Sequence, residues 1–351
     1  MNQSGANLND WWMYDPATNA WTQKNNHPGT ARSYCGFFSI GSKGYITCGN
    51  TSSSYLSSLW EYDPVTDAWT QKTSFPGAAR RHPCAAVVNG EGYVGCGDGS
   101  SGNYNDFYKY NPVANAWTPI PNFQGTARHH PVAISFNNKL YVGTGHDLNN
   151  VKCADFYVYD PATNGWSQIA SIPGIGRIAP AGVVLNGKFL VIWGGDEFAS
   201  TYSDYFAYNP ATSAWSSYNY TAGPCLFAPV WFEINGKAYL GTGEYNGNSE
   251  DAFYEITDLS TGVNMLPDYC AEVSVFPNPL KETATVLLTG TDFLLEGCEF
   301  RMYCLDGKMV RCLKMNSPKA QLERGTLAGG TYLYEVLNGN SIIGSGKVIV
   351  Y

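Results

Sequence analysis

Hydrophobic and polar positions along this 351-residue chain follow a pattern that returns about every 48 residues. Its clearest part is a decapeptide in which aromatic and apolar positions flank a polar turn, as in WEYDPVTDAW at Trp60–Trp69. Five copies end at tryptophans spaced 48, 48, 49 and 49 residues apart, namely Trp21, Trp69, Trp117, Trp166 and Trp215. Self-similarity at this period is the signature of a repeat architecture.

Each decapeptide predicts a β-hairpin. The Asx side chain can bond to nearby backbone and proline presets φ, so an Asx-Pro pair is typical of a turn. The five pairs are Asp15-Pro16, Asp63-Pro64, Asn111-Pro112, Asp160-Pro161 and Asn209-Pro210. Two further strands, Cys84–Val88 and Gly92–Gly97, are predicted around the Asn89-Gly90 turn. Four antiparallel strands per period make one blade of a β-propeller.

The repeat resembles the kelch repeat of galactose oxidase-like and kelch-like propellers, which has a glycine pair, then a tyrosine, then a tryptophan. The glycine pair is complete at Gly194-Gly195, and the other copies read Cys48-Gly49, Cys96-Gly97, Thr144-Gly145 and Thr242-Gly243. The tyrosines are Tyr14, Tyr62, Tyr110, Tyr159 and Tyr208. The resemblance implies a propeller fold, which hosts many functions and specifies none of them.

The strand pattern predicts an all-β ring of about six blades over residues 1–266, with the first blade incomplete. Residues 9–24 supply only the outer two strands of a blade. A degenerate outer hairpin is expected at Ala252–Val263. The opening MNQSGANLND lacks the basic and apolar regions of a signal peptide. We therefore expect a truncated or misplaced N-terminus.

The repeat stops near Met265, and a different pattern follows. A proline-containing linker is expected at 267–272. Residues 273–351 read as short strands separated by turns, which predicts a small Ig-like β-sandwich. The expected strands are Val273–Pro277, Ala284–Leu288, Glu299–Leu305, Met309–Met315, Thr331–Leu337 and Gly346–Tyr351.

This last segment resembles the C-terminal sorting domain of the type IX (Por) secretion system of Bacteroidetes. The motifs that carry the resemblance are VFPNPL, MYCLDGKMV, LAGGTYLYEV and GSGKVIV. Their central residues are Pro277, Asn278, Pro279, Asp306, Gly307, Gly330, Tyr332, Gly346 and Lys347. The resemblance implies the type IX machinery as a partner and a product that is secreted or attached to the outer surface of the cell.

Composition narrows the possible partners. The net charge of −8, without a basic cluster, argues against nucleic-acid binding. No apolar run approaches the ~18 residues of a membrane-spanning helix. The ten cysteines show no metal-ligand spacing. Export would allow disulfides to form, and their pairing stays open.

Residues that flank the inner strands should gather at one face of the ring. Arg forks there could hold an acidic sugar or an acidic peptide side chain. Alternatively, each arginine pairs with a carboxylate or with loop carbonyls inside the blades. The ligand-binding candidates at this rim are Arg32, Arg80, Arg128, Arg177, Tyr34, His82, His130, Asp98, His146, Asp196 and Glu244.

The function favoured by these patterns is a non-catalytic binding module for a glycan or a protein. The alternative is a secreted carbohydrate-active enzyme, oxidase-like or epimerase-like, with its site on the arginine-lined face. A third possibility is a structural spacer or adhesin domain. No catalytic residue, metal or cofactor is predicted, because the histidines lie on separate blades and no phosphate loop, nucleophile elbow or zinc motif is present.

Overall fold

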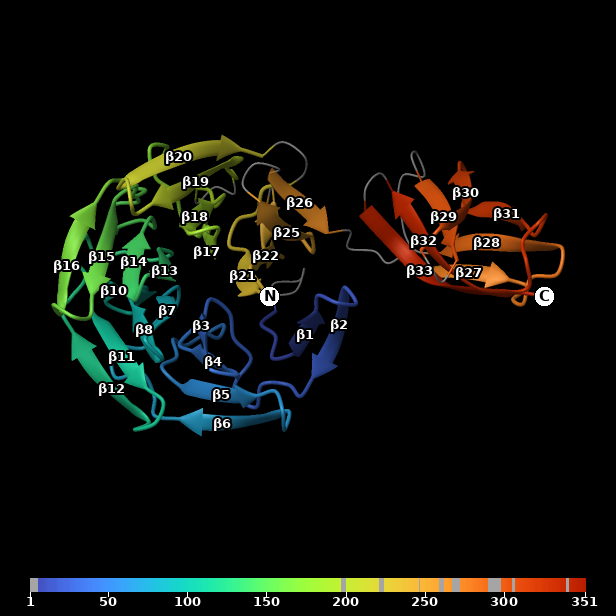
Figure 1. Cartoon of the computed structure of the whole chain (residues 1–351). Helices are drawn as coiled ribbons and strands as arrows, with labels where there is room; N and C mark the ends of the chain where they lie inside the picture. The colour runs from blue at the N-terminus through green and yellow to red at the C-terminus, as the bar shows by residue number, and fades with distance from the viewer. Residues whose placement is uncertain are drawn as a thin grey trace. The chain divides into compact units, whose positions relative to one another are not determined.

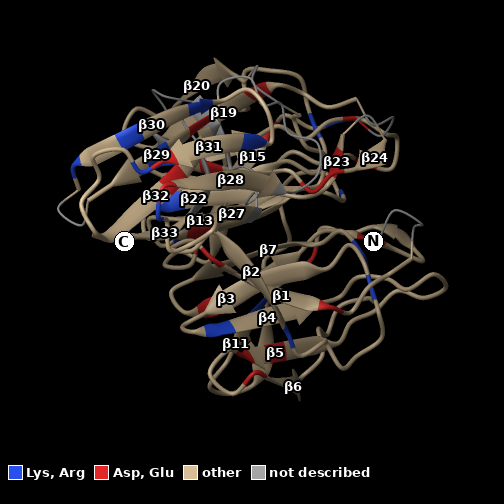
Figure 2. Cartoon of the chain, turned by 90° about the vertical axis from the view of Figure 1, so that its right-hand side faces the viewer, with Lys and Arg blue, Asp and Glu red and all other residues tan. Residues whose placement is uncertain are grey.

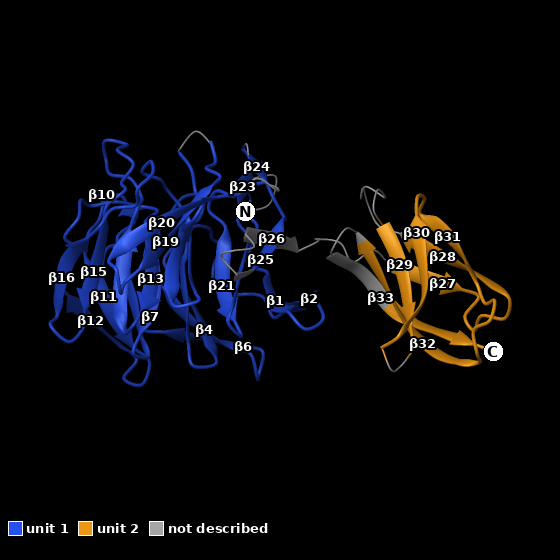
Figure 3. Cartoon of the chain, turned by 45° about the horizontal axis from the view of Figure 1, so that its top comes forward, with its two compact units in different colours: residues 1–264 blue, residues 265–351 orange. Residues whose placement is uncertain are grey.

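The computed structural model describes residues 6–196, 200–220, 224–245, 247–258, 262–266, 272–289, 298–304, 307–338 and 341–351. Two compact units, Met1–Asn264 and Met265–Tyr351, divide the chain (Figure 3). Of the expected linker, residues 267–271 lie outside the described residues, and residue 272 begins a strand. No helix in the described ranges could cross a membrane.

The first unit is a ring of antiparallel sheets around a central axis (Figure 1). Five sheets have four strands each and form full blades. The first two blades are β3 (Gly36–Ile40), β4 (Lys43–Thr47), β5 (Leu59–Asp63), β6 (Ala68–Lys72), and β7 (Cys84–Val88), β8 (Glu91–Gly95), β11 (Phe107–Asn111), β12 (Ala116–Ile120). The next two are β13 (Val132–Phe136), β14 (Lys139–Gly143), β15 (Phe156–Asp160), β16 (Gly165–Ile169), and β17 (Ala181–Leu185), β18 (Lys188–Ile192), β19 (Asp204–Asn209), β20 (Ala214–Asn219). The fifth is β21 (Val230–Ile234), β22 (Lys237–Gly241), β25 (Phe253–Asp258), β26 (Gly262–Leu266).

Short two-residue ladders extend the loops of two blades. They are β9 (Asp98–Gly99) with β10 (Gly102–Asn103), and β23 (Glu244–Tyr245) with β24 (Asn248–Ser249). Lys and Arg positions alternate with Asp and Glu positions along the ribbon, without a long run of one charge (Figure 2).

The decapeptide forms the outer hairpin of each blade, and its residues explain the turn. Asp63 accepts a hydrogen bond from the Val65 amide at 2.9 Å, which closes the Asx turn. The Tyr62 hydroxyl donates to Asp67, which has a positive φ of 50°. The Trp69 indole donates to the Asn25 carbonyl of the preceding hairpin at 3.0 Å. The tryptophan thus joins neighbouring blades, which a repeat ring needs for closure.

An isolated hairpin, β1 (Trp11–Asp15) and β2 (Ala20–Lys24), lies between the first and last full blades (Figure 1). On one side, the ring of Trp11 packs edge-on against Trp69 at 5.0 Å. On the other side, Tyr14 packs against Phe253 at 4.9 Å. The ring is therefore closed by aromatic contacts at its outer layer, and it comprises five full blades and one incomplete blade, as the repeat predicts.

The register of the fourth blade differs from the sequence-based alignment. Trp193 and Gly194 have positive φ values of 55° and 78°, as do Cys48 and Gly49 of the first blade, at 60° and 88°. Gly195 then forms the isolated bridge to Ile178. The glycine pair at Gly194-Gly195 is therefore shifted by one residue from the pairs with which the sequence aligned it.

The second unit contains two sheets that enclose a core of Leu, Val, Met and aromatic side chains. One sheet has the order β27 (Glu272–Phe276), β28 (Thr283–Thr289), β31 (Lys319–Glu323). The other has the order β30 (Met309–Met315), β29 (Cys298–Tyr303), β32 (Gly330–Asn338), β33 (Ser341–Val350). The sequence pattern missed β31, because Leu322 is its only fully buried side chain.

Candidate functional site

A cavity of about 550 Å³ in the propeller is lined by residues from the inner strands and the loops before them. A repeated position defines its polar end. Tyr34, His82, His130, Ala179 and Ala228 occupy this position, and all have φ between 52° and 56°. The amide of each of the last four donates to the carbonyl of its predecessor, at 2.9 to 3.3 Å. This backbone chain fixes the side chains from neighbouring blades beside one another.

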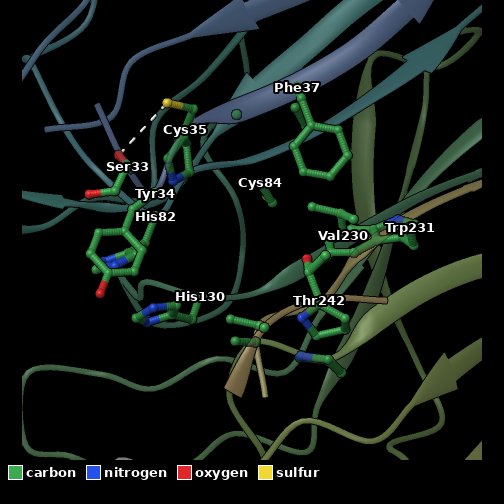
Figure 4. Close-up of a pocket in the computed structure, with 18 of the residues that line it drawn as sticks. Ser33, Tyr34, Cys35, Phe37, His82, Cys84, His130, Val230, Trp231 and Thr242 are labelled. Carbon is green, nitrogen blue, oxygen red and sulfur yellow. Dashed lines mark hydrogen bonds between the residues drawn. The ribbon is translucent and has the colours of Figure 1, made fainter. Parts of the chain in front are cut away.

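The opposite side of the cavity is apolar. Phe37 of β3 and Trp231 of β21 meet edge to face at 5.2 Å, where the inner strands of the first and last full blades approach each other. Figure 4 shows these rings and Val230 across the cavity from Tyr34, His82 and His130. Glu244 and Glu250 also line the cavity. The cavity therefore combines an aromatic wall with a polar end, as ligand-binding pockets often do.

Four histidines from two blades cluster beside the polar end, and two of them, His82 and His130, line the cavity. The rings of His82 and His130 stack at a centroid distance of 3.6 Å, and His129 and His146 lie 3.8 Å apart. Asp98 accepts a bond from His82 Nδ1 at 2.8 Å and one from Arg81 Nε at 3.0 Å. Asn103 Oδ1 lies 2.9 Å from His129 Nδ1.

The protonation of this cluster follows from its burial. Desolvation lowers the pKa of His82, although Asp98 opposes the effect. Desolvation also lowers the pKa of His129 to about 3, and that of His130 falls well below its usual value. Burial raises the pKa of Asp98, but the bonds from His82 and Arg81 outweigh it and hold that pKa below its usual value. At neutral pH the imidazoles of His82, His129 and His130 are neutral beside an ionised carboxylate.

The rim arginines point into the blades. Arg80, Arg128 and Arg177 are fully buried. Their Nη1 atoms donate to carbonyls 16 residues ahead, Cys96, Thr144 and Trp193, at 2.9 to 3.1 Å. Each guanidinium also bonds to a carboxylate of the same blade, namely Asp106, Asp155 or Asp204. Arg32 repeats the carbonyl bond, pairs with Ser58 instead of a carboxylate, and is the one of the four that lines the cavity.

For Arg80, Arg128 and Arg177 these contacts match the alternative in which each arginine pairs with a carboxylate and a loop carbonyl inside its blade. The cavity is not lined by arginines from every blade. Asp196 lies one residue beyond the repeat position and accepts a bond from the Ser200 amide. The structure thus brings together Tyr34, His82, His130, Asp98 and His146 of the predicted rim. It adds His129, which the sequence analysis missed; the repeated Arg81-His82 and His129-His130 pairs are the signal that could have identified it.

Residues of the C-terminal motifs organise their sandwich. Asn278 docks on β33, because its amide donates to the Lys347 carbonyl and its oxygen accepts from the Ile349 amide. Gly346 lies against the Tyr334 ring, where an added Cβ would be 2.5 Å from the hydroxyl. The Tyr332 hydroxyl donates to the Ala328 carbonyl. Gly307 has a positive φ of 85° in a turn, and Asp306 lies outside the described residues.

Comparison with known proteins finds family models that match part of each unit. Residues 1–127 match the model of the KLHDC2/KLHL20/DRC7 Kelch-repeats domain. Residues 274–351 match the Secretion system C-terminal sorting domain. This chain is a kelch-type β-propeller followed by a type IX secretion sorting domain. A comparison with curated proteins found no match.

A solved structure titled "Structure of YjhT" shares the propeller fold. It matches with a TM-score of 0.62 and 15% sequence identity, over 73% of this chain and 91% of that one. At this identity the likeness supports the fold alone. The sorting domain marks the kelch propeller as a secreted or cell-surface protein and implies the type IX machinery as its partner.

Proposed function

We propose that this protein is an exported kelch propeller whose axial cavity binds a glycan. One observation carries the proposal: a single cavity of about 550 Å³ has Phe37 and Trp231 on one side and Tyr34 with the histidines on the other. A sugar ring presents apolar C–H faces together with hydroxyl groups. Aromatic rings provide large apolar surface for the former, and phenol, imidazole and carboxylate groups can bond to the latter.

The sharpest test removes the aromatic wall. Glycan-array screening of the full chain, in a buffer containing a chelator, would identify a binding sugar, and calorimetric titration would measure its affinity. We expect Trp231→Ala to weaken binding by at least about tenfold, which corresponds to about 1.4 kcal/mol. Trp12→Ala is the matched control, because Trp12 is 48% exposed and does not line the cavity.

Three outcomes would contradict the proposal. They are the absence of any bound glycan, an equal loss in both tryptophan variants, and capture of a protein ligand with unchanged affinity in Trp231→Ala. Turnover of a bound sugar would instead establish the enzymatic alternative, since binding alone consumes no substrate.

The second half of the proposal is that residues 273–351 direct type IX secretion of the propeller. It is supported by the family match and by the separate compact unit that these residues form. We expect a chain lacking residues 268–351, produced behind a Sec leader in a bacterium with this secretion system, to remain in the periplasm. Val113→Ser in the full chain is the control, because Val113 is 96% exposed. Normal surface display of the deleted chain would contradict the proposal.

A further inference from the structure

Three histidines beside the polar end of the cavity bring ring nitrogens close to one another. The candidate ligand atoms of His82, His129 and His130 all lie within 4.8 Å of one another. His82 and His129 come from neighbouring blades, and His129 and His130 are consecutive. Within the described residues, the buried His82 Nε2 and His130 Nδ1 atoms have no hydrogen-bond partner.

The partners of two of these rings determine which nitrogen carries the lone pair. The Asp98 carboxylate can only accept, so His82 Nδ1 carries the proton and Nε2 is free to bind a ligand. Asn103 donates through Nδ2 to the His146 carbonyl, so the Oδ1 atom that faces His129 Nδ1 also accepts. His129 therefore also has its lone pair on Nε2. Metal-binding histidines are typically held in this way by an oxygen on the far nitrogen.

The fold itself does not require histidine at these positions. Ala179 and Ala228 have the same positive φ at the equivalent position in two other blades. The residues equivalent to His129 include Ser33 and Ile178, which form the same kind of bridge. A buried nitrogen without a partner costs about 1–3 kcal/mol. The cluster thus retains buried ring nitrogens without a hydrogen-bond partner. They lie at positions where alanine adopts the same backbone conformation in other blades.

We infer that His82, His129 and His130 bind a divalent transition-metal ion, Zn²⁺. Neutral imidazoles suit zinc, copper and nickel, whereas calcium and magnesium need oxygen ligands. Three imidazoles leave one position of a tetrahedral zinc site for water or for a group that enters the cavity. At Zn–N distances of about 2.0–2.1 Å the nitrogens would lie about 3.3 Å apart, so the stacked rings of His82 and His130 must rotate away from each other to complete the site. The inference does not depend on glycan binding.

The test uses the full chain without a histidine tag, stripped with a chelator and then titrated with Zn²⁺. We expect one Zn²⁺ per chain by elemental analysis and calorimetry, and a higher melting temperature with metal. His82→Ala and His130→Ala should each abolish stoichiometric binding, and both introduce the residue of an equivalent blade. Asp98→Asn should weaken affinity by about 10–100-fold. His27→Phe is the control, since His27 packs against Trp60 and Trp69, away from the cluster.

Cobalt substitution provides an independent readout. Co²⁺ bound by three imidazoles in a tetrahedral site gives intense visible absorption, which His82→Ala and His130→Ala should lose and His27→Phe should keep. Substoichiometric zinc in the wild-type chain, or stoichiometric zinc in the folded His82→Ala/His130→Ala double variant, would overturn the inference. Because these titrations contain no sugar, their failure is distinguishable from failure of glycan binding.

Discussion

Replacing Arg80 with methionine tests whether the repeated arginine holds a blade together. Arg80 is fully buried and donates to the Ala78 and Cys96 carbonyls and to both oxygens of Asp106. Methionine fills much of the same volume but leaves these acceptors unpaired. Breaking a buried ion pair costs about 3–5 kcal/mol. The Asp106 side chain keeps 28% exposure and can be partly hydrated, so we expect the lower end, about 3 kcal/mol.

Arg32→Met is the matched comparison, because Arg32 makes the same carbonyl bond but pairs with the neutral Ser58 hydroxyl at 2.9 Å. Its loss leaves no charge behind, so we expect a smaller destabilisation of about 1–2 kcal/mol. Urea unfolding followed by tryptophan fluorescence measures both values. All ten tryptophans lie within the propeller, so the signal reports this unit alone. For a domain of this size, about 3 kcal/mol corresponds to a melting shift of roughly 6–12 °C.

A loss below about 1 kcal/mol in Arg80→Met, or equal losses in the two variants, would refute this reasoning. Reduced glycan binding by a fully stable Arg80→Met chain would also refute it, since that result would return Arg80 to the ligand site.

Other perturbations test separate parts of the molecule. Burial and the Arg32 charge lower the pKa of His27 from 6.5 to about 4, so the contribution of His27 to stability is complete above pH 6.5 and falls by up to about 3 kcal/mol as the pH decreases to 4. His27→Phe, which introduces the residue found at Phe75, should remove this loss in urea titrations at pH 7 and pH 5; an unchanged pH slope would contradict it. Gly143→Ala should lower the free energy of unfolding by about 1–3 kcal/mol, because the new Cβ would lie 2.3 Å from the Phe156 ring. Gly165→Ala is the control: its Cβ would have no atom nearer than 3.8 Å, so thermal unfolding should show a neutral or slightly stabilising effect. Asn278→Ala should speed hydrogen exchange of the Ile349 amide about fivefold, as expected for a loss of about 1 kcal/mol, and unchanged exchange would show that the motif does not anchor β33.

Much of the fold could be predicted because it depends on local and repeated signals. The Asx-Pro turns and their aromatic neighbours specify the outer hairpins within ten residues, and the 48-residue spacing repeats them around a ring. The end of the repeat near Met265 marks the start of the sorting domain. Two errors came from weak local signals. The glycine pair at Gly194-Gly195 suggested an alignment of the fourth blade that differs by one residue from its backbone conformation. The strand β31 has too few buried positions to show an alternation of apolar and polar residues.

The candidate site depends on contacts between residues that lie far apart in the sequence, and local patterns do not predict such contacts. The sequence predicted that Arg80 lies near the rim of the ring. Only the fold pairs its side chain with Asp106, 26 residues ahead, and this ion pair directs the side chain into the blade. His82 and His130 lie 48 residues apart and meet because a left-handed backbone position and an inter-blade hydrogen bond place their rings together. By itself, the sequence determined the repeated blades and the change of domain, since these follow from periodicity. Only the tertiary structure decided which polar groups are buried in blades and which face the cavity, because side-chain direction depends on partners from distant strands.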